Sequence, residues 1–155
     1  MLLDILFNET IVVPLISNEK KAVIEELVDK LNENNKISNR NQVLQAILDR
    51  EDVMSTGVGD GVAIPHGKSD AVHEIVAALG ITREPVEFAS IDEKPVRIVW
   101  LLVGPPGQTG PHLKALSRIS RLMHNGEFRE QLIHSENQEQ VLACIQEEEK
   151  KCFDN

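Results

Sequence analysis

Residues 55–67, STGVGDGVAIPHG, interrupt a chain whose pattern is otherwise largely helical on either side. Glycines stand at positions 57, 59, 61 and 67, and a helix does not continue through glycines at that density. The apolar residues before Pro65 instead predict a short strand over 61–64, because proline removes a backbone donor and ends a strand. His66 therefore follows a strand end directly, and strand ends are where α/β sheets hold their binding sites.

Two amphipathic helices are predicted before this segment. Apolar residues recur at i, i+3, i+4 and i+7 over residues 19–33, which is the pattern of a helix with one buried face. A second helix is predicted over about residues 40–50, where Asn39 and Gln42 resemble a capping box. Arg50 falls in its last turn, where a cation suits the helix dipole.

Strands and then helices are predicted after the glycine-rich segment. Residues 97–104, RIVWLLVG, are apolar at nearly every position, so they predict a central strand covered on both faces. Pro111 is placed to open a helix, and Gly126 to stop it. The predicted elements are strands over 74–82 and 97–104 and helices over 111–124, 127–134 and 136–149, the last capped by Ser135.

These elements predict one α/β domain over residues 1–155. Helices come first and last, with strands between them, so we expect a sandwich in which a mixed central β-sheet is flanked by helices on both faces. The chain of 155 residues is long enough to bury a core without disulfide or metal support. Residues 149–155 are largely polar and are expected to be solvated and to fray.

Composition excludes several function classes. The net charge is −9, so the chain is a poor general binder of nucleic acid or of anionic membranes. No apolar run is long enough for a membrane span, and the first residues lack the basic start of a signal peptide. Cys144 and Cys152 have no zinc-site spacing. We therefore expect a cytoplasmic protein without metal or cofactor, and with no direct membrane insertion.

The histidines are the best candidates for chemistry, because the glycine run fails the nucleotide-binding patterns. Both the dinucleotide fingerprint and the P-loop would need a glycine at position 62, where Val62 stands. His73, His124 and His134 are expected to be idle or to favour helix ends. His66 follows a strand, and His112 falls in the first turn of a helix, whose positive end favours a neutral imidazole and attracts anions. A neutral imidazole is a nucleophile.

Residues 56–67, TGVGDGVAIPHG, resemble the active-site signature of enzyme IIA of the fructose/mannitol class. These are phosphocarriers of the bacterial phosphoenolpyruvate-dependent sugar phosphotransferase system, and the nitrogen-regulatory IIA proteins share the signature. Arg50–Glu51 precedes the glycine run as in the family, and Pro111–His112–Leu113 resembles the segment with its second histidine. The resemblance extends over about residues 4–148.

The resemblance implies a phosphotransferase. His66 would be the phosphorylated nucleophile, His112 would hydrogen-bond the phosphate, and Arg50 would stabilise the charge on the phosphoryl oxygens. These residue types suit the reaction, because phosphoryl transfer depends on positioning and on cationic donors. The resemblance also allows a pocket floor formed by Thr56, Gly57, Gly59 and Gly61.

The resemblance implies a histidine phosphocarrier protein as the upstream partner. For the downstream step two functions stay open. In the first, the phosphoryl group passes to a cysteine of enzyme IIB for sugar uptake. In the second, a nitrogen-type regulatory protein binds a kinase or transporter according to the phosphorylation state of His66, and no sugar is moved. A third alternative is a domain that keeps the shape without the chemistry. In either active case, we expect His66 in a shallow depression with exposed apolar residues around it.

Overall fold

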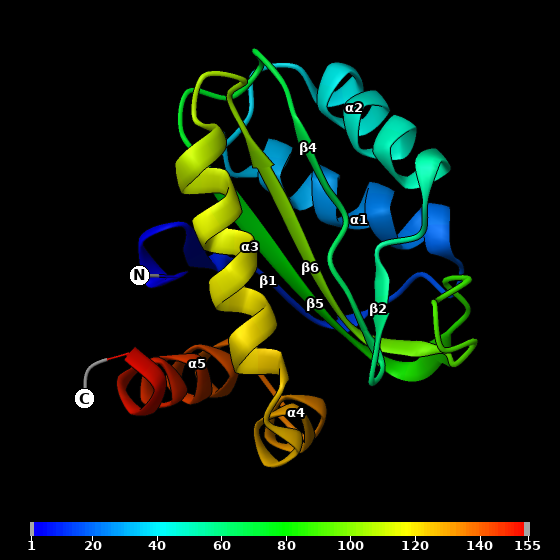
Figure 1. Ribbon diagram of the computed structural model, residues 1–155, viewed down its shortest axis with the longest axis vertical. Helices are drawn as coiled ribbons and strands as arrows, with labels where there is room; N and C mark the ends of the chain where they lie inside the picture. Colours follow the sequence, from blue (N-terminus) through cyan, green and yellow to red (C-terminus); the bar gives the residue numbers. More distant parts are fainter. Residues whose placement is uncertain (1, 154–155) are drawn as a thin grey trace.

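The computed structural model describes residues 2–153. The chain forms one α/β domain with a six-stranded sheet and five α-helices (Figure 1). The strands are β1 (Leu6–Leu15), β2 (Gly57–Gly59), β3 (Val62–Ala63), β4 (His66–Lys68), β5 (Val76–Val86) and β6 (Val96–Gly104). The helices are α1 (Lys20–Glu33), α2 (Arg40–Val53), α3 (Thr109–Met123), α4 (Gly126–Ile133) and α5 (Gln138–Phe153), after the 3-10 turn η1 (Leu2–Asp4).

The sheet is mixed, with β5 and β6 as its antiparallel centre. β1 runs parallel to β5 on one side, whereas β3 and then β4 run parallel to β6 on the other. β2 turns back antiparallel to β3. Ile98 through Val103 are fully buried, which confirms that the apolar segment over 97–104 is a central strand.

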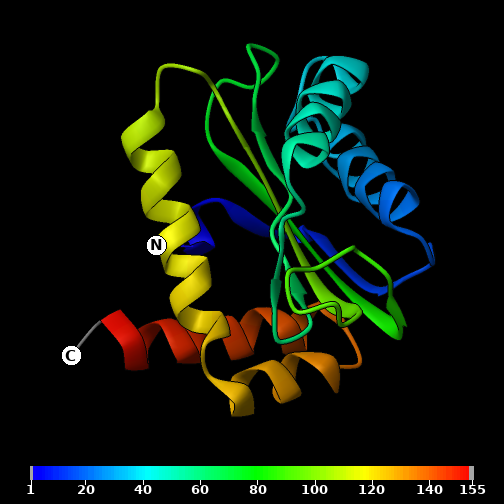
Figure 2. The same cartoon turned by 45° about the vertical axis from the view of Figure 1, so that its right-hand side comes forward.

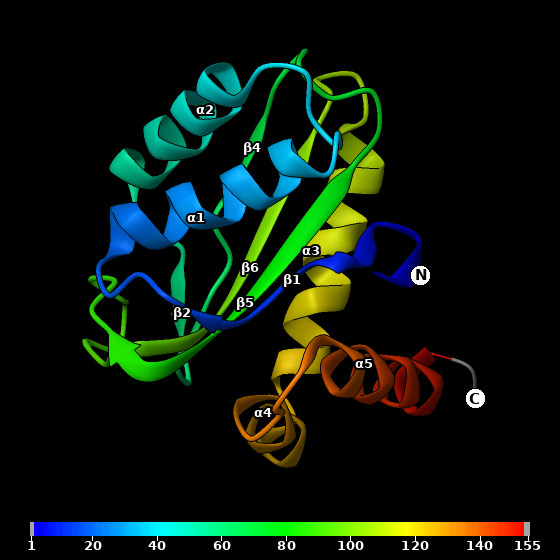
Figure 3. The ribbon, with the colours of Figure 1, turned by 180° about the vertical axis from the view of Figure 1, so that it is seen from behind.

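Helices cover both faces of the sheet, as predicted. Figure 2 shows α1 and α2 on one side of the sheet and α3, α4 and α5 on the other. Figure 3, seen from the side opposite to Figure 1, shows α1 and α2 in front of the sheet. Each layer has its own apolar cluster against the sheet. The separation follows from the alternation of side chains along each strand: Leu101 and Val103 pack under α1 and α2, whereas Trp100 and Leu102 pack under α3 to α5.

The helix ends agree with the sequence in part. Asn39 caps α2 as predicted, because its side chain accepts a hydrogen bond from the Gln42 N–H at 3.1 Å. The predicted cap at Ser135 is wrong: its hydroxyl donates to the Gln131 carbonyl, and Asn137 accepts from the Gln140 N–H instead. Gly126 does not stop α3, which ends at Met123, but is the first residue of α4.

The expectation of a solvated, frayed tail from residue 149 is wrong for the residues described. α5 continues to Phe153, and Glu149 is fully buried. Its carboxylate accepts a hydrogen bond from the Leu2 N–H at 3.0 Å and pairs with Arg118 at 3.5 Å. The Arg118 guanidinium also lies 4.3 Å from the centre of the Phe153 ring. These contacts order the last helical turns against the start of the chain, and residues 154–155 lie outside the described part.

The sequence analysis did not predict β1. This strand forms the edge of the sheet beside β5, with two irregularities in its register. Across residues 2–153, none of the helices has the length and apolar character needed to span a membrane.

Candidate functional site

A cavity of about 370 Å³ lies where the two helical layers meet at the β4 edge of the sheet. It brings together the three residues that the sequence singled out for chemistry: Arg50 from α2, His66 from β4 and His112 from α3. Leu113, 60% exposed, supplies an apolar rim of the kind we expected for docking. The lining residues are Ala46, Arg50, His66, Gly67, Lys68, His112, Leu113 and Leu116.

β4 is positioned by its pairing with β6. His66 lies opposite Leu102, whose N–H donates to the Pro65 carbonyl at 2.9 Å. At Gly67 a Cβ atom would come within 3.3 Å of the Ala46 backbone. The absence of a side chain therefore allows α2 to pack closely on β4, and this close packing brings Arg50 to the histidines.

The geometry of His66 fixes its tautomer. The Nδ1 atom lies 2.8 Å from the Ile64 carbonyl oxygen, which can only accept, so Nδ1 carries the proton in the neutral ring. The lone pair is then on Nε2. Burial lowers the pKa of His66, and the charge of Arg50 lowers it further, although the Ile64 hydrogen bond and Glu51 oppose this shift. The ring is therefore neutral and nucleophilic at pH 7.

His112 is almost completely buried, 3% exposed, and its ring centre is 5.9 Å from that of His66 with the planes tilted by 57°. Burial lowers the pKa of His112 to about 4, with smaller contributions from His66 and Lys68. The neutral ring expected from the helix terminus is found, but burial is its main cause. Within residues 2–153, neither ring nitrogen has a hydrogen-bond partner. One can therefore donate to a ligand in the cavity.

The close packing of His112 depends on Gly104 at the end of β6. A Cβ atom there would lie 3.2 Å from Nδ1 of His112 and 2.8 Å from Cγ1 of Ile75. Both separations are shorter than ordinary van der Waals contact, so a larger residue would displace the ring.

Two cationic side chains face the histidines. Arg50 donates from Nη1 to the Met54 carbonyl at 2.9 Å, so one of its five N–H groups is used at the helix end. Lys68 donates from Nζ to the Thr109 hydroxyl at 3.0 Å. The sequence analysis did not identify Lys68 as a site residue. Its position two residues after His66 on a strand could have placed it on the same side as His66.

The predicted pocket floor lies elsewhere. Thr56, Gly57, Gly59 and Gly61 are not among the residues that line the cavity. They form the β2–β3 hairpin, where Gly59 and Gly61 supply the positive φ angles of 103° and 77° that the tight turn needs. Gly57 packs directly against Ser90. The glycine run therefore builds the strand pair beside β6 and does not line this cavity.

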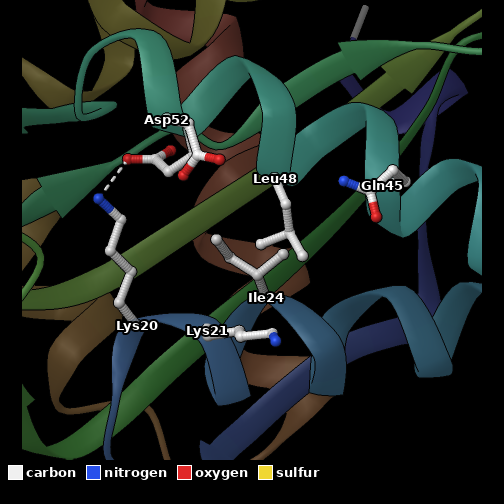
Figure 4. Close-up of a pocket in the computed structure, with 7 residues that line it drawn as sticks. Lys20, Lys21, Ile24, Gln45, Leu48 and Asp52 are labelled. Carbon is white, nitrogen blue, oxygen red and sulfur yellow. Dashed lines mark ion pairs between the residues drawn. The ribbon is translucent and has the colours of Figure 1, made fainter.

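A larger cavity, of about 460 Å³, lies between α1 and α2 (Figure 4). Lys20, Gln45 and Asp52 contribute polar groups, and Ile24 and Leu48 lie between them. Lys20 is already paired with Glu51, with 2.7 Å between Nζ and Oε2. The lining of this larger cavity contains no histidine or cysteine. The smaller cavity, with two imidazoles and two cations, is therefore the better candidate for chemistry.

The rest of the described chain offers no metal centre: no three or more His, Cys, Asp or Glu residues in 2–153 cluster as metal ligands. Cys144 and Cys152 are free and half-buried. Of the other histidines, His73 is exposed, while His124 and His134 cap the ends of α3 and α4.

Residues 4–148 match the family model described as "Phosphoenolpyruvate-dependent sugar phosphotransferase system, EIIA 2". The chain is 35% identical over 147 residues to the fructose-specific EIIABC component of the system in Bacillus subtilis, covering 95% of this chain but 23% of that protein. This chain therefore corresponds to about a quarter of that relative.

Two solved structures share the fold. The nitrogen regulatory protein IIA-Ntr from Neisseria meningitidis superimposes with a TM-score of 0.85 at 35% identity, over 92% of this chain and 97% of that one. Enzyme IIA of the mannitol system from Escherichia coli, solved in complex with phosphorylated enzyme IIB, gives a TM-score of 0.78 at 20% identity over 90% and 95%. The second likeness concerns the fold alone.

Proposed function

Because the chain belongs to the EIIA type 2 family and is a IIA phosphotransfer component of the phosphoenolpyruvate-dependent system, we propose that it carries the phosphoryl group on Nε2 of His66. The observation that supports this assignment is the 2.8 Å hydrogen bond from Nδ1 to the Ile64 carbonyl. It leaves the lone pair on Nε2 of a neutral ring in a cavity lined by cationic groups.

In the proposed step, the Nε2 lone pair of His66 attacks the phosphorus atom of an upstream phosphohistidine. The new N–P bond forms as the N–P bond of the donor breaks, and that electron pair returns to the donor nitrogen. The Nδ1 proton stays on its hydrogen bond to Ile64 throughout. Because the transition state spreads charge over three phosphoryl oxygens, the surrounding donors determine the rate.

His112 and Arg50 are proposed as those donors, and Lys68 as a nearby positive charge. The buried, neutral His112 has no partner within residues 2–153, so its ring N–H is available to a phosphoryl oxygen. Among the hydrogen bonds within residues 2–153, Arg50 gives one N–H to Met54, and the remaining N–H groups of its guanidinium fork match phosphate geometry. Lys68 adds positive charge at the exposed rim.

The downstream partner we propose is the cysteine of a sugar-specific enzyme IIB, with the histidine phosphocarrier protein as the upstream donor. In support, the matched relatives include a fructose-specific component, and a mannitol IIA of this fold has been solved with phosphorylated IIB. The thiolate would attack the phosphorus of phosphorylated His66, forming an S–P bond while the N–P bond breaks and Nε2 regains its lone pair. The exposed Leu113 beside the cavity suits transient docking.

A regulatory role is the second candidate, and one observation favours it. The IIA-Ntr structure from Neisseria meningitidis superimposes on this chain with a TM-score of 0.85 at 35% identity, whereas the mannitol IIA superimposes with a TM-score of 0.78 at 20% identity. In this role, phosphorylation of His66 would add about −1.5 to −2 charge to a docking face and so control binding to a kinase or transporter.

Reconstituted phosphoryl transfer tests the proposal. The chain is incubated with phosphoenolpyruvate, enzyme I and the histidine phosphocarrier protein, and we expect an acid-labile adduct of about 80 Da on His66. Adding fructose-type or mannitol-type IIB proteins then distinguishes the two functions, because rapid loss of the adduct to IIB supports sugar transport. An adduct mapped to another residue, or none on a folded chain, would overturn the assignment of His66.

A further inference from the structure

Glu51, the residue after Arg50, has a buried carboxylate, with its side chain 4% exposed. It accepts hydrogen bonds from both the N–H and the hydroxyl of Thr56, at 2.8 and 2.5 Å. It also pairs with the Lys20 ammonium at 2.7 Å. A buried carboxylate is costly unless its lone pairs are used, and three donors use them here.

The Glu51 contacts belong to a polar network that joins three parts of the chain. Lys20, the first residue of α1, also donates to the Phe88 carbonyl at 3.1 Å, and Ser55 donates to the same carbonyl at 2.7 Å. Figure 4 shows the Lys20 side chain reaching across from α1 to the carboxylate on α2. The segment 54–56 is therefore anchored at Ser55 by the Phe88 carbonyl and at Thr56 by the Glu51 carboxylate.

This anchored segment is the one that holds Arg50. α2 ends at Val53, and Met54 leaves the helix with extended backbone, at φ −165° and ψ 138°. The Met54 carbonyl accepts the 2.9 Å hydrogen bond from Nη1 of Arg50. The contacts that hold the backbone at residues 54–56 therefore determine where this carbonyl lies. The carbonyl in turn determines where the Arg50 guanidinium lies beside the cavity.

We propose that Glu51 is a positioning residue for phosphoryl transfer: its bonds to Thr56 and Lys20 fix the segment 54–56, whose Met54 carbonyl orients Arg50 beside His66. This inference rests on the proposed function of His66. Glu51 does not line the histidine cavity, so it acts through Arg50 and touches neither the phosphoryl group nor the nucleophile. The Lys20 ammonium and the Thr56 donors balance the Glu51 charge locally, and its remaining electrostatic effect opposes the lowering of the His66 pKa.

A double-mutant cycle separates positioning from general stabilisation. Glu51→Gln should slow phosphoryl transfer by about 10- to 100-fold, since a misplaced group costs rates of that order. Arg50→Ala should slow it by a similar or larger factor, and the double variant should be no slower than Arg50→Ala alone. If the two effects multiply, Glu51 does not act through Arg50 and the proposal is overturned.

Two further variants keep the test valid if Glu51→Gln does not fold. Thr56→Val removes the hydroxyl at nearly constant shape and should slow transfer, whereas Thr56→Ser keeps it and should restore most of the rate. Asp52→Asn is the matched control, because Asp52 is exposed and takes part in none of these bonds. Equal rates for the Val and Ser variants would contradict the proposal.

A donor-free measurement distinguishes this inference from the proposed function. In NMR spectra, Glu51→Gln should shift the Arg50 side-chain Nε–H signal and speed hydrogen exchange of the Thr56 amide, and Asp52→Asn should change neither. If the wild type takes no phosphoryl group on His66, the proposed function fails while this measurement still decides the role of Glu51. Unchanged Arg50 and Thr56 signals would overturn that role.

Discussion

β3 and β4 run along the same side of β6 in the same direction, yet they differ in what covers them. Val62 and Ala63 lie opposite Ile98 and Val99, are completely buried, and are covered on their other side by β2. His66–Lys68 lies opposite Leu102–Gly104, and in residues 2–153 no strand pairs with its outer side. Only the two residues 64 and 65 separate the covered segment from the uncovered one.

The difference shows how one edge of a sheet can serve both stability and chemistry. In the covered half, Gly59 and Gly61 adopt positive φ angles, which allow the chain to turn so that β2 pairs with β3. The uncovered half is only three residues long and carries a lysine, two features by which proteins keep open edges from pairing with other chains. At the uncovered edge, His66 is half-exposed and lines the cavity.

The largest expected effect is in the uncovered half. His66→Gln should lower phosphoryl acceptance by at least about a thousandfold, because the attacking lone pair is lost. The half-exposed position should leave the thermal midpoint nearly unchanged. Acceptance is measured by mass spectrometry with the phosphocarrier donor, and His73→Gln serves as the exposed control. If His66→Gln and His73→Gln accept the phosphoryl group to a comparable extent, the uncovered half does not carry the chemistry.

The second effect is a pH-dependent loss of stability near the uncovered half. In the folded chain the pKa of His112 is about 4, whereas in the unfolded chain it takes its ordinary value near 6.5. Below pH 6.5 the unfolded state therefore binds a proton that the folded state excludes, and stability falls until about pH 4. The loss should be on the order of 3 kcal/mol.

Urea unfolding at pH 7.5 and at pH 4.5 measures this loss. His112→Gln should remove most of the difference in the free energy of unfolding between the two pH values, and His73→Gln should leave it unchanged. If His112→Gln has the same pH dependence as the wild type, the ring is not the buried, neutral group described above.

The third effect is expected in the covered half. Gly57→Ala would overlap the buried Ser90 side chain, so we expect a loss of about 1–3 kcal/mol in the free energy of unfolding. Gly110→Ala is the control, because a Cβ atom there meets nothing within 4 Å. Transfer to His66 per folded molecule should stay close to wild type. A large loss of transfer without a loss of stability would mean that the glycine hairpin belongs to the site.

The smallest effect concerns the rim of the cavity. Lys68→Met should slow transfer by a factor of about three to ten at low salt, and by less at high salt, because exposed cations mainly steer charged partners. Lys21→Met, in the cavity between α1 and α2, is the matched control and should have no effect. A salt-independent loss would instead indicate that Lys68 contacts the phosphoryl group directly.

Local patterns were sufficient for most of the fold. The continuous apolar run of β6, the periodic apolar stripe of α1 and the capping pattern of α2 predicted the sandwich. β1 could not be found this way, because Asn8, Glu9 and Thr10 interrupt its apolar residues. Thr10 becomes acceptable in the sheet only through tertiary contacts, since its hydroxyl donates to the Ala77 carbonyl at 3.0 Å.

The sequence was most informative about the residues of the candidate site whose side chains have a distinctive chemistry of their own. His66, His112 and Arg50 line one cavity, as the resemblance to the family implied. The glycine run was placed there too, because it belongs to the same signature as His66, but Thr56 and the three glycines do not line the cavity. Glu51 was missed because its partner Lys20 lies thirty-one positions away, and no local pattern reports such a contact.

The bond between the Leu2 N–H and Glu149 has a consequence for engineering the chain. It holds η1 against α5, and Figure 1 shows the start of the described chain and the end of α5 on the same side of the molecule. The connectivity could therefore be circularly permuted: a short linker would join η1 to the end of α5, and the chain would be opened in the exposed loop at residues 91–95. In such a permutant the order of synthesis would change while the buried Glu149 kept its partners.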